Sequence, residues 1–292
     1  MKKVAFQGWK NCVELKSGDF KLIVTTDVGP RVMGGFVGKN KHNIFNVDKD
    51  LAGTSGAKEW VNYGGHRLWH SPEIKPRTYA PDNSKVTVKE LKDGSVSFSA
   101  GKEKNTGITK TLMITPLGGN KFKIEHHLRN DNMWEIEVAA WAITVMAPGG
   151  VAVAPQNRAP FALLPNTFYA FWPYTRMNDP RYTFGEDFLL VRQDSRKSPC
   201  KLGFNCENGW LSYINKGTVF TKSFEHFIDA EYPDNGCSIE IYTNEKMLEA
   251  EALSPLYQLG PGEEIVHVEE WCAADGAPEI RNEKDAAKFF SR

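Results

Sequence analysis

The strongest structural signal in this sequence is Met247-Leu-Glu249-Ala-Glu251-Ala-Leu-Ser-Pro255, followed by Leu259-Gly-Pro-Gly-Glu263 and Ile265-Val-His267-Val-Glu269-Glu-Trp271. Its residues alternate in character, and glycine and proline at positions 260–262 interrupt the alternation, which predicts two strands joined by a turn. Because successive side chains of a strand point to opposite faces, Glu249 and Glu251 share one face. Two carboxylates on one face suit a site that handles protons or hydroxyl groups, and they equally suit a solvated sheet face.

Strand signals of the same kind continue towards the N-terminus. Short apolar runs at residues 20–26, 84–91, 95–99, 108–114 and 121–128 are separated by turn signals such as Lys92-Asp-Gly94. This rhythm predicts an all-β chain of antiparallel strands. Helical periodicity is confined to a short segment near Asp48 to Trp60 and to the tail from Asn282 to Phe290, where apolar residues form one face.

Size, charge and cysteine content restrict the classes of function. A chain of 292 residues can form one large all-β domain, so we expect a single domain over residues 1–292. Lysine plus arginine equals aspartate plus glutamate, 36 against 36, which argues against nucleic acid and membrane partners and favours a neutral small molecule. The five cysteines are an odd number without close pairs, which argues against disulfides and zinc. Without a signal peptide or a run of membrane-spanning length, we expect a cytoplasmic protein.

The segment Trp60-Val-Asn-Tyr63-Gly-Gly-His66-Arg67-Leu68-Trp69-His70-Ser-Pro-Glu73 gathers the most candidate site residues. Its two glycines allow a turn or a close backbone approach. Histidine exchanges protons near neutral pH, aromatic rings cover the C–H face of a sugar, and arginine supplies a donor fork. The alternative interpretation is that Tyr63, Trp69 and a histidine are core residues.

A second candidate region is rich in proline and aromatic residues and spans positions 147–196. It is either a linker or a set of ordered loops, and its aromatic content favours ordered loops. Its part Phe171-Trp-Pro-Tyr-Thr-Arg-Met-Asn-Asp-Pro-Arg181 could form the rim of a ligand site, or Trp172 and Tyr174 could pin it to the core. Arg158 and Arg176 could meet an anionic group or tether loops.

Metal, phosphate-loop and serine-hydrolase chemistry find no support in the sequence. The neighbours His126 and His127 would point to opposite faces of a strand. His66 and His70 would share a helix face, but the glycines and proline around them oppose a helix. No lysine-containing phosphate loop and no Gly-x-Ser-x-Gly occurs, and we expect no metal site.

Three motifs resemble the galactose mutarotase-like, or aldose 1-epimerase-like, superfamily. Leu248-Glu249-Ala-Glu251 with Leu259-Gly-Pro-Gly-Glu263 is similar to its Leu-Glu-Thr-Gln strand and Leu-x-Pro-Gly-Glu turn. Tyr63-Gly-Gly is similar to its His-Gly-Gly step, and Tyr232-Pro-Asp-Asn-Gly to Ile241-Tyr-Thr243 resembles its penultimate hairpin. The resemblance covers residues 19–271 and implies a large antiparallel β-sandwich with few short helices, called a supersandwich, that carries a sugar cleft.

The resemblance also implies a mechanism and a set of site residues. In mutarotases a glutamate takes the proton of the anomeric hydroxyl while a histidine protonates the ring oxygen, and no cofactor takes part. Glu249 falls on the glutamate position. The superfamily's histidine before Gly-Gly is Tyr63 here, and the strand from Glu137 to Met146, expected to carry the acid histidine, contains none. His66 or His70 is therefore the candidate acid. The candidate substrate-binding residues are Tyr63, Arg67, Trp69, Glu73, Arg158, Trp172, Tyr174, Arg176, Glu225 and Glu251.

Two hypotheses of function follow. The first is an aldose 1-epimerase-like isomerase that interconverts sugar anomers by glutamate and histidine acid–base catalysis. The second is a carbohydrate-binding or sensing protein without catalysis, which the missing histidine favours. A polysaccharide lyase or hydrolase on the same sandwich fits less well without an export signal. The identity of the sugar, its phosphorylation and the oligomeric state stay open.

Overall fold

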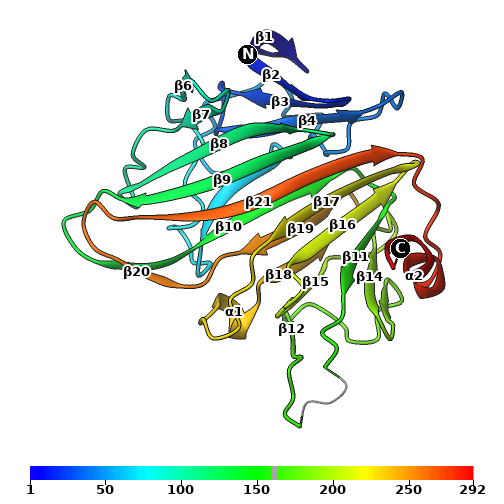
Figure 1. Cartoon of the computed structure of the whole chain (residues 1–292). Helices are drawn as coiled ribbons and strands as arrows, with labels where there is room; N and C mark the ends of the chain where they lie inside the picture. The colour runs from blue at the N-terminus through cyan, green and yellow to red at the C-terminus, as the bar shows by residue number, and fades with distance from the viewer. Residues whose placement is uncertain (160–162, 292) are drawn as a thin grey trace.

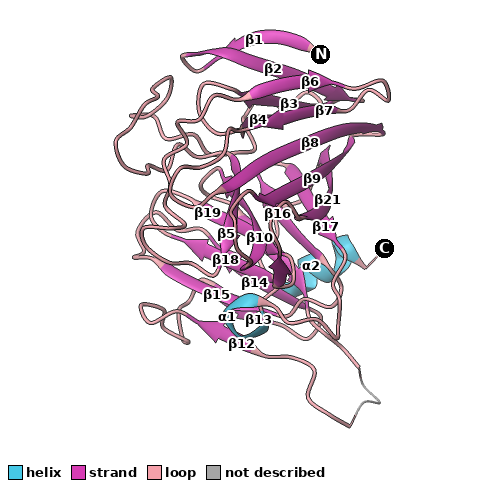
Figure 2. Cartoon of the chain, turned by 90° about the vertical axis from the view of Figure 1, so that its left-hand side faces the viewer, coloured by secondary structure: helices cyan, strands magenta, loops and turns pink. Residues whose placement is uncertain are grey.

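The computed structural model describes residues 1–159 and 163–291, and nearly all of the regular structure in this part is β-strand (Figures 1 and 2). The strands form two large sheets in which every pair of neighbours runs antiparallel, and the main core lies between the sheets. The first sheet follows the order β1-β2-β3-β4-β5-β10-β19-β18-β15-β12, with β20 paired to β10. The second follows β13-β14-β11-β16-β17-β21-β9-β8-β7-β6.

The strands of the first sheet are β1 (Lys2–Phe6), β2 (Trp9–Ser17), β3 (Phe20–Thr25), β4 (Arg31–Val37), β5 (His66–Ser71), β10 (Ile136–Met146), β12 (Tyr169–Phe171), β15 (Cys200–Phe204), β18 (Ile239–Thr243), β19 (Leu248–Leu253) and β20 (Tyr257–Leu259). Those of the second are β6 (Thr87–Glu90), β7 (Val96–Ser99), β8 (Ile108–Gly118), β9 (Lys121–Asn130), β11 (Val151–Pro155), β13 (Tyr182–Phe184), β14 (Phe188–Arg192), β16 (Trp210–Asn215), β17 (Thr218–Phe224) and β21 (Glu264–Asp275). The helices are α1 (Pro233–Gly236) and α2 (Glu283–Phe290).

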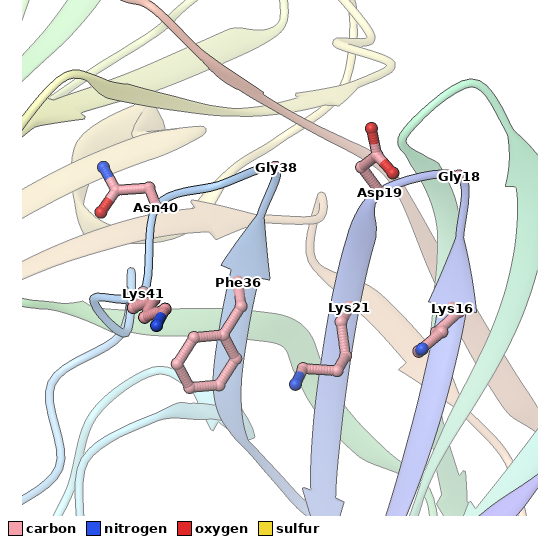
Figure 3. A pocket seen from close by; sticks show the side chains of 8 residues that line it. All are labelled: Lys16, Gly18, Asp19, Lys21, Phe36, Gly38, Asn40 and Lys41. Carbon is pink, nitrogen blue, oxygen red and sulfur yellow. The ribbon is translucent and has the colours of Figure 1, made fainter.

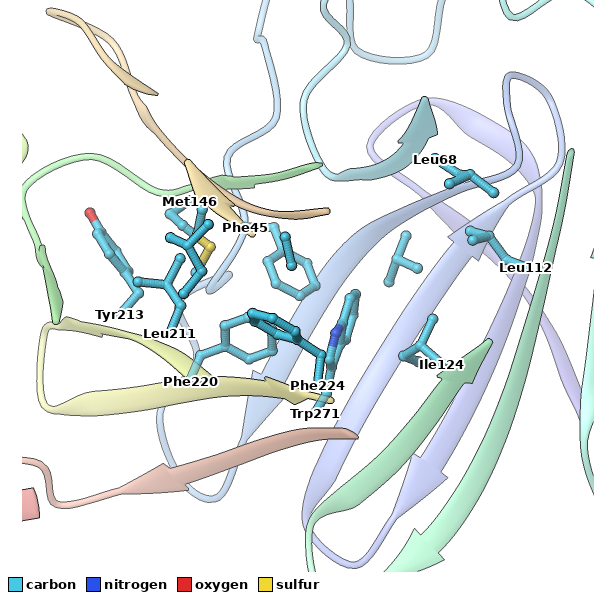
Figure 4. Packing of buried hydrophobic residues seen from close by; sticks show 14 of the residues in the cluster. Phe45, Leu68, Leu112, Ile124, Met146, Leu211, Tyr213, Phe220, Phe224 and Trp271 are labelled. Atoms are coloured by element: carbon cyan, nitrogen blue, oxygen red, sulfur yellow. The ribbon is translucent and has the colours of Figure 1, made fainter. Parts of the chain in front are cut away.

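Aromatic side chains fill the centre of the core. Phe45 packs edge-on against Phe220 and Trp271, with ring centroids 5.4 and 5.7 Å apart (Figure 4). Along β17, buried and partly exposed residues alternate strictly, so one face of the strand lies in this core. Each fully buried large apolar side chain contributes roughly 1.5–3 kcal/mol relative to exposure, and this burial holds the two sheets together.

The C-terminal stretch forms strands as predicted, but its turn joins a different pair. Residues 260–263 connect β20 of the first sheet to β21 of the second, and β19 also lies in the first sheet. The chain therefore crosses between the sheets after β20 instead of making a hairpin from β19 to β21. The turn chemistry marked a chain reversal correctly, but it could not show that the short strand β20 precedes it.

The two helical expectations have opposite outcomes. The tail forms α2, whose Ala286 is buried and whose Phe290 ring lies 5.1 Å from the ring of Trp210. The segment from Asp48 to Trp60 contains turns and no helix, so that expectation was wrong. Its periodicity was short, and Gly53 at φ +76° and Gly56 at φ +75° hold the backbone outside the helical region. No helix in the described residues has both the length and the apolar character needed to cross a membrane.

A polar cluster interrupts the apolar core behind β5, β10 and β19. His66 Nε2 lies 2.8 Å from His126 Nε2, and the Nδ1 of His66 lies 2.9 Å from the hydroxyl of Thr144. Lys222 pairs with Glu269 at 2.9 Å, and all of these side chains are fully buried. Burial, with the neighbouring His126 and Lys222, lowers the pKa of His66 well below its ordinary value. Burial also lowers the pKa of His126 to about 3, despite the nearby Glu269 carboxylate.

We predict that this cluster makes the fold sensitive to acid. Below pH 6.5 the unfolded chain binds protons on these histidines while the folded chain does not, so the free energy of unfolding falls as the pH drops towards about 3. The contribution of one such histidine amounts to about 2 kcal/mol between pH 6.5 and 5. Urea denaturation across this range should show a shallower pH dependence for His126→Gln than for the wild type.

His127 provides the matched control. It follows His126 on β9, lies outside the core and pairs with Glu264 at 2.8 Å. The His127→Gln variant should keep the pH dependence of the wild type. Equal slopes for the wild type and His126→Gln would contradict the assignment.

Candidate functional site

A cavity of about 330 Å³ lies on the outer face of the first sheet, opposite the core. We call it the cleft. Its volume is close to the lower end of the range for small-molecule sites, roughly 300–1,000 Å³. The residues that line it are Trp60, Asn62, Arg67, Trp69, Glu73, Tyr79, Trp141, Ile143, Tyr174, Lys201, Tyr242, Met247 and Glu249.

The alternation of side chains along the strands determines which residues form the floor of the cleft, the part of its lining that projects from the sheet itself. Trp69 on β5 pairs directly with Trp141 on β10, so both rings stand on the same face, 5.5 Å apart. Two positions along, Ile143 pairs with Arg67 on one side and with Glu251 on the other. The floor is therefore built by residues two apart on adjacent strands.

Two glycines lead the chain into β5. Gly64 and Gly65 have positive φ angles of 89° and 67°. A Cβ atom at Gly64 would lie 2.3 Å from the carbonyl oxygen of Asn46, so no larger residue fits there. The glycines fulfil both expected roles, the turn and the close approach, and they fix where Arg67 and Trp69 emerge.

Glu249 is held at one side of the cleft by two donors. Arg67 Nη1 donates to its Oε1 at 3.1 Å, and the amide of Asn62 donates to the same oxygen at 3.3 Å. The guanidinium of Arg67 also lies over the rings of Trp60 and Trp69, at 5.3 and 4.5 Å from their centroids. The carboxylate is thus fixed in orientation, while Glu249 keeps 8% of its surface exposed.

A buried charge cluster lies beside it. Lys201 Nζ lies 2.5 Å from Glu240 Oε2 and 3.0 Å from Glu251 Oε2. The indole N–H of Trp141 donates to the same Glu251 oxygen at 2.7 Å. The ammonium also lies 4.6 Å from the ring centroid of Trp141 and 4.5 Å from that of Trp172. We call Lys201, Glu240 and Glu251 the lysine–carboxylate triad.

Burial sets the charge of this triad. It raises the pKa of Glu251, and it raises that of Glu240 further, well above the ordinary glutamate value, although Lys201 opposes both shifts. Burial alone would lower the pKa of Lys201, but the two carboxylates outweigh it and the net shift is upward.

Polar aromatic residues form the rim. The hydroxyl of Tyr79 donates to a Glu73 oxygen, and its ring lies 5.0 Å from that of Trp69. Tyr174 is half exposed, and its ring lies 6.5 Å from that of Tyr242. The cleft therefore combines flat apolar surfaces with carboxylates and fixed cations.

The structure brings several predicted residues together here. Arg67, Trp69, Glu73, Tyr174 and Glu249 line the cleft. Trp172 covers Lys201, and Glu251 lies beneath the cavity in the triad. Glu249 and Glu251 share one face of β19 as expected, while Leu248, Ala250 and Ala252 lie in the core. The solvated-face interpretation does not hold, since both glutamates are buried.

The two candidate acid histidines lie elsewhere, which corrects that expectation. His66 and His70 are fully buried on the core face of β5, because they are one residue out of step with Arg67 and Trp69. A histidine on the core face of the sheet cannot reach a ligand on its outer face.

Four further candidates also lie away from the cleft. Tyr63 is buried against Trp9, with ring centroids 6.2 Å apart. Arg158 pairs with Asp187 at 2.5 Å, and Arg176 and Glu225 are exposed residues outside the lining set. Their assignments rested on nearness in sequence or on short motifs, which do not determine where a loop side chain lies.

Sequence reasoning missed two members of the triad, Lys201 and Glu240, and part of the aromatic wall. Glu240 and Lys201 each interrupt an apolar strand, Ile239-Glu-Ile241 and Cys200-Lys-Leu202, and a charge in such a run is the signal that was available. Trp141, Tyr79 and the other lining residues carry no comparable mark. No group of three or more histidine, cysteine, aspartate or glutamate side chains in the described residues is arranged to hold a metal ion.

A second cavity, of about 420 Å³, lies against β2, β3 and β4 and shares no lining residue with the cleft. Figure 3 shows Lys16 and Lys21 on neighbouring strands beside Phe36. Both lysines lie within 4 Å of Glu14, at 3.9 and 3.7 Å. Its lysines are surface residues, and it lacks the buried polar groups that distinguish the cleft.

No protein-family model matches the chain, and no curated protein matches it in sequence. Solved structures do match. A galactose mutarotase-like protein from Lactobacillus casei ATCC 334 superimposes with a TM-score of 0.60 at 11% identity, over 90% of this chain and all (100%) of the other. One from Clostridium acetobutylicum gives a TM-score of 0.56 at 13% identity, over 94% and 98%. A candidate aldose 1-epimerase from Escherichia coli K12 gives 0.57 at 11%, over 91% and 99%.

We predict that Lys201 is required for stability because it compensates the buried carboxyl groups. Lys201→Met would leave Glu240 and Glu251 without their cation, which should cost about 3–5 kcal/mol. Urea denaturation at pH 7 measures this loss. Lys121→Met is the control, because Lys121 and Glu270 form an exposed pair at 2.7 Å whose removal should change stability little. Equal stability of Lys201→Met and the wild type would refute the charge assignment.

Proposed function

We propose that this chain, a galactose mutarotase-like β-sandwich, binds a carbohydrate in the cleft and interconverts its anomers as an aldose 1-epimerase-like isomerase. The observation that carries the proposal is the Glu249 carboxylate, fixed by Arg67 and Asn62 beside the aromatic wall of Trp60 and Trp69. A carboxylate in this setting can accept the proton of an anomeric hydroxyl. The flat rings suit the C–H face of a pyranose.

The charge of the lining favours a neutral sugar. The two cations that line the cleft, Arg67 and Lys201, already pair with carboxylates. Glu73 and Glu249 add negative charge at the same cavity. A phosphate or carboxylate on the ligand would meet these carboxylates without finding an uncommitted lysine or arginine among the lining residues. We therefore expect binding of unphosphorylated aldoses.

One observation supports the alternative, a carbohydrate-binding protein without catalysis. The described residues that line the cleft include no histidine. A protein of this kind would bind sugars in the same cavity and leave the rate of anomer exchange unchanged. Ligand-induced stabilisation without turnover is its signature.

We predict that the protein accelerates anomer exchange of at least one neutral aldose. Polarimetry or NMR on freshly dissolved single anomers, with a panel of hexoses and pentoses, measures the rate against the uncatalysed reaction. Glu249→Gln should lower kcat by roughly 100-fold or more, because the amide cannot accept the proton. It should still bind the sugar.

Glu186→Gln is the matched control, because Glu186 is an exposed glutamate outside the cleft. It should leave the rate unchanged. If sugars raise the melting temperature of the protein but none has its anomer exchange accelerated, the isomerase proposal is rejected in favour of the non-catalytic binding protein. Neither stabilisation nor acceleration would reject both functions.

A further inference from the structure

Anomer exchange in the cleft requires a proton donor as well as Glu249, and this inference rests on the proposed function. Among the described lining residues, Arg67 is committed to Glu249, and a guanidinium does not give up its proton. Besides Glu249, the lining groups that can both hold and release a proton are Lys201, Glu73 and the three tyrosines Tyr79, Tyr174 and Tyr242. Glu73 accepts a hydrogen bond from the Tyr79 hydroxyl and therefore acts there as an acceptor.

The tyrosines fit this role less well than the lysine. The Tyr79 hydroxyl already donates to Glu73, and the Tyr242 hydroxyl is bound to the amide of Asn244 at 3.2 Å. Tyr174 stands half exposed at the rim, where water competes for its hydroxyl.

Lys201 has the geometry of a donor. Of the three N–H bonds of its ammonium, Lys201 donates one to Glu251 Oε2 at 3.0 Å, and Glu240 Oε2 lies 2.5 Å from Nζ. Lys201 also lines the cavity together with Glu249. On the sheet, Lys201 pairs with Tyr242, which pairs with Glu249, so these two side chains project from the same face two strands apart. That separation is about 9–10 Å between backbones, and Tyr242 stands on the same face between the two side chains, as part of the surface on which a sugar ring would lie.

We propose that the Lys201 ammonium is the acid that protonates the ring oxygen of the sugar, with Glu249 as the base. Glu249 takes the proton of the anomeric hydroxyl, and the electron pair of that O–H bond forms the C1=O double bond. The bond from C1 to the ring oxygen breaks, and the ring oxygen takes a proton from Lys201.

The reverse step closes the ring. After rotation about C1–C2, the former ring hydroxyl attacks C1 and returns its proton to the Lys201 amine. The carbonyl oxygen takes the proton back from Glu249. Both residues end in their starting states, so the cycle needs no further reactant.

Glu251 and Glu240 act as positioning residues in this scheme. Glu251 holds the ammonium in place through Oε2, which also accepts from Trp141 Nε1. Gly203 pairs with Glu240 across the sheet. Its lack of a side chain leaves space for Glu240, because a Cβ atom at position 203 would lie 3.0 Å from Glu240 Cγ. The groups that face the triad are Trp141, Trp172, Tyr79, Tyr174, Asp234, Cys237 and Glu249.

The Lys201→Arg variant distinguishes the role of Lys201 as a proton donor from its role as a positive charge. Arginine keeps the positive charge between the carboxylates but does not release a proton. We expect kcat for the best sugar to fall by about 100-fold or more, with a much smaller change in KM. A thermal melt checks that the variant is folded. Lys110→Arg is the control, because Lys110 is a buried lysine that contacts Glu103 at 2.5 Å outside the cleft, and it should keep the wild-type kcat.

The outcomes distinguish the two proposals. One outcome would reject only the lysine. In it the wild type accelerates anomer exchange, Glu249→Gln does not, and kcat of the folded Lys201→Arg variant stays within about threefold of the wild-type value. Lys201 is then not the acid, and the proposed isomerase function stands. If the wild type accelerates no sugar, the proposed function itself fails.

The pH profile gives a second, independent test. Glu251→Gln removes the negative charge that favours the protonated lysine, so the loss of kcat on the alkaline side should move to lower pH. An unchanged alkaline limb in a folded Glu251→Gln variant with measurable activity would overturn the assignment of Lys201. Where activity is too low for a profile, the 15N chemical shift of the Lys201 side chain, followed with pH, should show the same downward shift of its titration.

Discussion

Lys222 ties the two sheets together directly behind the cleft. From β17 its ammonium reaches across the core and donates to the carbonyl oxygens of Ala142 and Ala250, at 2.9 and 3.3 Å. Glu269 makes this burial tolerable by pairing with the ammonium at 2.9 Å, since an uncompensated buried charge costs several kcal/mol. Ala142 and Ala250 belong to β10 and β19, the strands that carry Trp141 and Glu249. The spacing of the cleft floor therefore depends on a contact made on the other side of the sheet.

Strand alternation then separates the chemistry of the two faces. Along β5, Arg67 and Trp69 enter the cleft, while His66 and His70 enter the core. A slip of one residue in the register would exchange the two sets and bury Arg67 among apolar side chains. The polar core cluster opposes such a slip, because His66 bonds to Thr144, its cross-strand partner on the same face. The histidines thus fix the register of the strand whose other face forms the site.

The sequence alone predicted the class of fold better than the site. Short alternating segments and the motif around Glu249 were sufficient for an antiparallel β-sandwich, because both are local signals. The site needed long-range information. Lys201 and Glu251 are fifty positions apart in the chain and meet only because β15, β18 and β19 are adjacent. The period of two along β5 does place Arg67 and His66 on opposite faces, just as it separates His126 from His127 on β9.

Burial also separates the roles of the two glutamates on β19. Glu251 is fully buried, and its Oε2 accepts from Trp141 and Lys201, so the protein encloses its carboxylate. Glu249 keeps part of its surface exposed, and its partners Arg67 and Asn62 both bind a single oxygen, Oε1. Its second oxygen is thus left for a ligand. A base must present a free lone pair to its substrate, which the partly exposed Glu249 can do and the fully buried Glu251 cannot. The same strand therefore carries one carboxylate suited to proton transfer and one suited to holding a cation.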